Sequence, residues 1–157
     1  MSWQNVPRAS FMFLHAARLQ AHYATQWLAR AARAYVPAQP NDWHTNLGWD
    51  DAFGGLTTHP LPDGSRLGLR IADLTLAFLD VHPKELALDG RAEAEVLTWL
   101  RGHVSARNLV SGKLDEPLPY TLPDHALALG GRYSLEELGD AFKVLGTWYA
   151  NAHGALS

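Results

Sequence analysis

Residues 61–88, LPDGSRLGLRIADLTLAFLDVHPKELAL, contain the pattern that decides the fold. The stretch opens with the proline, aspartate, glycine and serine that are typical of a turn. Polar and apolar residues then alternate over 66–71, as they do in a half-buried strand. A second apolar run at 74–79 and a third run at 84–88, separated by a His-Pro turn, predict two more strands. The stretch therefore predicts an antiparallel β-meander.

Upstream of the meander, the periodicity is first helical and then extended. Residues 7–36 predict a long helix that is capped by Asn5 and stopped by the prolines that follow it. Its apolar arc covers more than half of the circumference, which indicates a helix packed across a sheet or against a second subunit. Residues 45–51 and 54–60 predict one extended segment that breaks at a pair of glycines.

Downstream of the meander, two more helices enclose an irregular segment. Residues 89–103 predict a middle helix, and residues 105–133, which contain several prolines, predict an extended arm over the surface. Ser134-Leu135-Glu136-Glu137 matches a capping box, which predicts a C-terminal helix up to Leu156. We expect one α+β domain over residues 1–157, with the long N-terminal helix packed on an antiparallel β-meander, a middle helix and a C-terminal helix.

The composition narrows the classes of function. The chain has 157 residues, a net charge of −3 and no cysteine, which excludes thiolate nucleophiles, disulfides and cysteine-based metal sites. No basic cluster stands beside a row of aromatic residues, so we expect no nucleic-acid partner. Without a signal-peptide pattern or a run of about eighteen apolar residues, we expect a cytoplasmic protein with no membrane partner. No cofactor is indicated by any motif.

The first helix also carries a polar stripe. Such a stripe is commonly a solvated edge, and the alternative is the wall of a pocket. Gln20 points instead into the apolar arc of the helix. The stripe consists of His15, Arg18, His22, Gln26 and Arg33.

Residues 41–51, NDWHTNLGWDD, are the densest mixture of aromatic and hydrogen-bonding groups in the chain. Polar side chains between two tryptophans are typical of a small-ligand site. The alternative is a loop whose tryptophans fill the core while its polar groups cap turns. On the last helix, Trp148, Asn151 and Ala152 share a face, where Asn151 could donate to a ligand or finish the helix.

Three motifs resemble an uncharacterised bacterial domain family. They are Leu14-His15 with Gln20, Asn41-x-Trp43-His44, and Gly55-Leu56-Thr57-Thr58-x-Pro60-x-Pro62. The resemblance covers about residues 11–80 and implies that His15, Gln20 and His44 lie near one another. No activity comes with the family. Residues 118–125 and the last helix replace the aromatic-rich C-terminal part that the family would imply.

These observations support a leading functional hypothesis and two alternatives. The leading hypothesis is a small-ligand pocket between the first helix and the meander, with His15 or His44 as the candidate general base if the protein is an enzyme. The pocket would be lined by His15, Gln20, Trp43, His44 and Trp49. The first alternative is a non-catalytic homodimeric interaction module, favoured by the very apolar first helix and the proline-rich arm.

The second alternative is a histidine-dependent metal site with hydrolase or lyase activity. The chain has eight histidines but no His-x-x-x-His pair. His15 and His22 share a helix face, yet they are separated by about 10.5 Å along the axis. Zinc–nitrogen bonds are only about 2.0–2.1 Å long, so a site would need ligands from distant segments. We therefore assign no metal ligands from the sequence.

Overall fold

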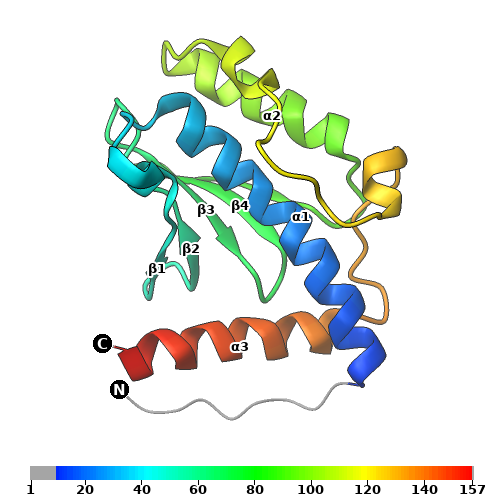
Figure 1. Cartoon of the computed structure of the whole chain (residues 1–157). Coiled ribbons are helices and arrows are strands. Elements are labelled where there is room, and N and C mark those ends of the chain that lie inside the picture. The colour runs from blue at the N-terminus through cyan, green and yellow to red at the C-terminus, as the bar shows by residue number, and fades with distance from the viewer. Residues whose placement is uncertain (1–9, 157) are drawn as a thin grey trace.

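A long helix lies across one face of a five-stranded antiparallel sheet in the computed structural model, which describes residues 10–156 (Figure 1). This helix is α1 (Phe11–Tyr35), and it is flanked by α2 (Glu93–Ala106) on one side and α3 (Gly139–Leu156) on the other. The arrangement confirms the predicted α+β class, with a middle and a C-terminal helix added to the N-terminal helix and the sheet.

The five strands follow one another across the sheet in chain order, β1-β2-β3-β4-β5, and every neighbouring pair is antiparallel. The predicted meander is therefore confirmed. The strands are β1 (Gly48–Asp50), β2 (Gly55–Thr57), β3 (Arg66–Arg70), β4 (Thr75–Leu79) and β5 (Lys84–Ala87).

The core lies between the sheet and the helices. Leu67 pairs with Phe78 and Leu69 pairs with Leu76, so their side chains share one face of the sheet, and all four are fully buried. α1 meets this face with small or branched side chains such as Ala24 and Leu28, also fully buried. The alternation in residues 66–71 therefore separates a buried face from one that carries Arg66 and Arg70.

α1 begins at Phe11 and is capped by Ser10, whose hydroxyl oxygen accepts a hydrogen bond from the Phe13 N–H at 3.2 Å. The predicted cap Asn5 and the predicted start at Pro7 lie outside the described residues. The helix ends at Tyr35, where Val36 is already extended. A 3₁₀ helix, η1 (Pro40–Thr45), follows.

The segment predicted as one interrupted strand is a hairpin of two short strands. β1 and β2 pair with each other, and the Gly54 N–H closes the turn by donating to the Asp50 carbonyl at 2.8 Å. Gly54 has a φ of +77°, which a residue with a side chain rarely adopts. The glycine pair therefore reverses the chain instead of merely bending it, and Thr45 belongs to η1.

The middle helix begins at Glu93, later than the predicted start at Asp89. Gly90 has a φ of 77°, and its N–H donates to the Tyr133 carbonyl at 2.8 Å. The Tyr133 N–H in turn donates a hydrogen bond to the Arg91 carbonyl at 2.9 Å. These bonds hold residues 89–92 against the segment that precedes α3 and keep them out of the helix.

The arm over residues 105–133 is extended only in part. It contains two 3₁₀ helices, η2 (Ser111–Asp115) and η3 (Ala126–Leu129), with residues 116–125 non-helical between them. Side chains of α1 hold this middle part, because the Tyr23 hydroxyl donates to the Pro123 carbonyl and Gln26 Oε1 accepts from the Tyr120 hydroxyl.

The predicted capping box at Ser134 does not start the last helix, which begins at Gly139. The Ser134 hydroxyl oxygen accepts from the N–H of Glu136 at 3.3 Å, two residues on instead of three. Glu137 then takes a left-handed φ of 61°, which interrupts any helix there. The Ser134 backbone is bonded to Gln20 instead, so a contact from a distant helix overrides the local pattern.

Candidate functional site

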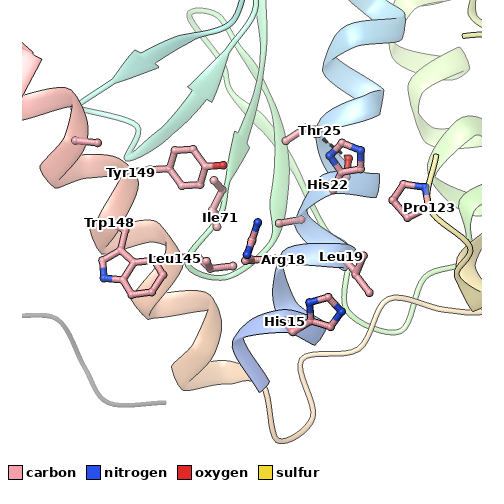
Figure 2. Close-up of a pocket in the computed structure, with 12 residues that line it drawn as sticks. His15, Arg18, Leu19, His22, Thr25, Ile71, Pro123, Leu145, Trp148 and Tyr149 are labelled. Carbon is pink, nitrogen blue, oxygen red and sulfur yellow. Dashed lines mark hydrogen bonds between the residues drawn. The ribbon is translucent and has the colours of Figure 1, made fainter. Parts of the chain in front are cut away.

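A groove of about 640 Å³ lies between α1 and α3 (Figure 2). Ile71, at the turn between β3 and β4, and Pro123, in the arm, complete its lining. We call it the α1–α3 groove. Its lining residues are His15, Arg18, Leu19, Ala21, His22, Thr25, Ile71, Pro123, Leu145, Trp148, Tyr149 and Ala152.

The α1 wall of the groove is the N-terminal half of the polar stripe. His15, Arg18 and His22 are all exposed and line the groove, and Arg18 projects toward α3 in Figure 2. Arg18 makes no ion pair or hydrogen bond with any other residue that the structure describes. The stripe is thus both a solvated face and a pocket wall, because the groove is open to solvent.

The α3 wall is aromatic and apolar. Leu145, Trp148, Tyr149 and Ala152 recur at helical spacing and line the groove. Trp148 is 46% exposed and Tyr149 is 47% exposed, so two large rings are open to a ligand. Trp49 stacks against Tyr149 with the ring centroids 6.5 Å apart and an interplanar angle of 6°. This contact supports the Tyr149 ring from outside the groove.

A close approach of backbone fixes α3 against the sheet. A Cβ atom at Gly146 would lie only 3.1–3.3 Å from atoms of Ala72, in the turn between β3 and β4. Glycine therefore allows α3 to pack on this turn, one helical turn before the exposed tyrosine. The spacing between the α3 wall and Ile71 follows from that contact.

Arg18 gives the described lining of the groove a formal positive charge. Its lining includes Arg18 and two imidazoles, and no carboxylate is among the lining residues. Asp73, near Ile71 in sequence, is engaged by the Arg70 guanidinium at 3.0 Å. A concave surface with unbalanced positive charge attracts anions.

Of the five side chains predicted to line one pocket, only His15 lies in the α1–α3 groove. Gln20 is buried and bonded to the Ser134 backbone. His44 is buried in η1, where its Nδ1 accepts from the Gln39 N–H at 3.0 Å. The exposed Trp43 packs its ring 4.6 Å from the His59 ring, and Trp49 reaches the groove only through Tyr149.

The groove lies between two helices, whereas the sequence predicts a pocket between the first helix and the meander. A helix rises about 1.5 Å per residue, so His15 is about 30 Å from Tyr35, where the chain leaves for η1. This distance lies between His15 and the end of α1 from which η1 and His44 follow, whereas the family resemblance implies that His15 and His44 lie near each other. The sequence placed Trp148 on a helix face, but nothing local showed that this face opposes Arg18.

Within residues 10–156, no three histidine, aspartate or glutamate side chains converge as a group that could hold a metal ion. The metal-dependent hydrolase or lyase hypothesis thus finds no ligand set in this part of the chain. In the same range, no helix is both long and apolar enough to cross a membrane.

Comparisons with protein-family models, with curated proteins and with solved structures give no match. The relation to an uncharacterised bacterial family therefore stays a prediction.

Proposed function

We propose that the protein binds a small organic anion with an aromatic or apolar body in the α1–α3 groove. The observation that carries the proposal is the exposed, unpartnered Arg18 facing the two half-exposed rings of Trp148 and Tyr149. A guanidinium accepts a carboxylate in a bidentate geometry, whereas the rings offer apolar contact area. The volume of about 640 Å³ is of the size that small-molecule sites have.

Binding is the part of the leading hypothesis that the lining supports. Of the two candidate general bases, only His15 lies in the groove. The Thr25 hydroxyl, the one aliphatic hydroxyl of the lining, donates to the His22 carbonyl at 2.7 Å (Figure 2). A cytoplasmic setting remains part of the proposal, in keeping with the absence of cysteine.

Titration with 3-phenylpropionate tests the proposal, because this probe has one carboxylate and one aromatic ring. We expect it to bind with higher affinity than its neutral amide, 3-phenylpropanamide. Arg18→Gln should weaken carboxylate binding roughly 10- to 100-fold, the usual range for a charge-assisted hydrogen bond, and leave amide binding unchanged. Calorimetry gives the affinity, and the Trp148 indole N–H signal in an NMR spectrum gives the location.

Arg33→Gln is the matched control, since Arg33 belongs to the same stripe but does not line the groove. It should leave the affinity for 3-phenylpropionate within twofold of the wild type. Equal affinity for the acid and the amide would contradict the proposed function. So would an Arg18→Gln variant that binds 3-phenylpropionate with wild-type affinity.

Self-association is a second candidate function, favoured by the N-terminal end of α1. Phe11, Met12 and Phe13 are 82%, 78% and 41% exposed, so three consecutive large apolar side chains lie on the described surface. An apolar patch of this kind is typical of an interface. We propose a homodimer through this end of the helix.

Light scattering at micromolar concentration should then give twice the chain mass for the wild type and the single chain mass after Phe11→Ser with Met12→Ser. Val81→Ser is the control, because Val81 is 88% exposed in the turn between β4 and β5, away from α1. A wild-type protein with the mass of one chain would contradict the homodimer.

A further inference from the structure

A second cavity, of about 360 Å³, lies between α1, α2 and the arm. Its lining differs from that of the α1–α3 groove, and it contains both a cation and an anion. Arg30 comes from α1 and Glu93 from the first turn of α2, while Leu122 and Leu127 come from the arm. We call it the α1–α2 cavity.

Glu93 belongs to a buried hydrogen-bond chain. The Tyr133 hydroxyl donates to Glu93 Oε1 at 2.6 Å, and the Trp27 indole N–H donates to the Tyr133 oxygen at 3.3 Å. Tyr133 is fully buried and Trp27 is 5% exposed, so this side of the carboxyl group is fixed in the protein. The Trp27 indole N–H also acts as a donor toward the Glu93 carboxyl group, which lines the cavity.

Burial raises the pKa of Glu93, although hydrogen bonds from Tyr133 and Trp27 and the charge of Arg30 act to lower it. The first turn of a helix is also a place where a carboxylate is ordinarily stabilised. Because the Glu93 carboxylate loses solvation on burial, a cationic partner would stabilise its charged form.

Arg30 is the matching positive group. Its guanidinium lies 5.8 Å from the centroid of the Trp27 ring and donates one hydrogen bond, to the Glu116 carbonyl at 3.2 Å. It makes no ion pair with a carboxylate of residues 10–156. Asp115, the other acid of the lining, is engaged by Arg101. The α1–α2 cavity therefore presents one cation and one anion that do not neutralise each other by contact.

We propose that the α1–α2 cavity binds a free α-amino acid with an aliphatic side chain. The ligand carboxylate meets the guanidinium of Arg30, and its ammonium group meets the Glu93 carboxylate, since both side chains line the cavity. The aliphatic side chain packs on the apolar side of the lining, which includes Leu97, Leu122 and Leu127. Only a zwitterion brings an opposite charge to both groups, because a simple acid brings no cation to Glu93 and a simple amine brings no anion to Arg30.

The test compares three probes of nearly the same shape. They are L-leucine, 4-methylpentanoate, which lacks the amine, and 3-methylbutylamine, which lacks the carboxylate. Leucine should bind at least 10-fold more tightly than either analogue in calorimetry. It should also shift the indole N–H signal of Trp27, which lines the cavity.

Glu93→Gln and Arg30→Gln should each weaken leucine binding at least 10-fold. Glutamine at position 93 keeps an oxygen that can accept from Tyr133, and Arg30 is held by a single hydrogen bond, so the second variant remains informative if the first is poorly folded. The controls are Glu136→Gln and Arg33→Gln, which change exposed residues outside the lining.

The proposal is overturned if leucine binds no more tightly than either analogue. It is also overturned if a folded Arg30→Gln variant binds leucine with the affinity of the wild type. Arg18→Gln separates the two sites, since it should leave leucine binding unchanged while it weakens binding of 3-phenylpropionate. Loss of leucine binding in Arg18→Gln would mean that the amino acid enters the α1–α3 groove and would also overturn the assignment to the α1–α2 cavity.

Discussion

Replacing Gly55 by alanine is expected to destabilise the protein by about 3 kcal/mol, the upper part of the usual range for an overpacked position. A Cβ atom at Gly55 would lie 2.3 Å from the carbonyl oxygen of Leu69 and 2.9 Å from the Cα of Arg70. Both contacts are with backbone, so no side-chain rotation relieves them. β2 would have to move away from β3, its partner in the centre of the meander.

Urea unfolding followed by circular dichroism measures this effect, and the melting temperature should fall by about 6–12 °C for a chain of this size. Gly48→Ala is the matched control, because Gly48 lies in the edge strand β1 and a Cβ atom there meets nothing within 4 Å. The control should change the free energy of unfolding by less than about 0.5 kcal/mol. Equal stability of the two variants would contradict the close approach of β2 to β3.

The parts of the fold that could be predicted from the sequence are those in which local pattern and tertiary contact agree. Residues 66–71 alternate because one side of β3 faces the core, and the arc of α1 is wide because the helix meets a sheet and two flanking segments. Element ends were less predictable, since distant groups decide them. Gly90 is held by Tyr133, and Ser134 is held by Gln20, in both cases against the local helix signal.

The candidate site could be predicted only on its α1 wall. His15, Arg18 and His22 recur on one helix face, so a pocket wall was one of two interpretations of the stripe. The opposite wall lies more than a hundred residues further along the chain, and no pattern within the last helix says which element it opposes. In segment 41–51 the mixture of aromatic and polar groups suits turns as well as a ligand site, and His44 accepts a hydrogen bond from the Gln39 N–H there.

Replacing Gln20 by leucine is expected to cost about 2–3 kcal/mol of folding stability and to leave ligand binding in the α1–α3 groove unchanged. The Gln20 amide is buried, donates to the Ser134 carbonyl at 2.9 Å and accepts from the Ser134 N–H at 2.8 Å. Leucine fills a similar space but leaves both backbone groups without a partner, and each orphaned group costs about 1–3 kcal/mol. Ser134 is only half-buried, which places the sum toward the lower end.

Gln26→Leu is the matched contrast, because the same chemical change on the same helix removes a bond from the exposed side chain of Tyr120. Gln26 Nε2 also donates to the His22 carbonyl at 3.0 Å, but that carbonyl keeps the bond from the Thr25 hydroxyl at 2.7 Å. Gln26→Leu should cost about 1 kcal/mol, near the typical net value of one hydrogen bond. Urea unfolding of both variants and titration of each with 3-phenylpropionate then separate two roles for Gln20. If Gln20 only ties α1 to the segment before α3, its replacement should lower the free energy of unfolding and leave the affinity for 3-phenylpropionate unchanged. A Gln20→Leu variant with wild-type stability and weakened binding would instead restore Gln20 to the ligand site that the sequence predicted.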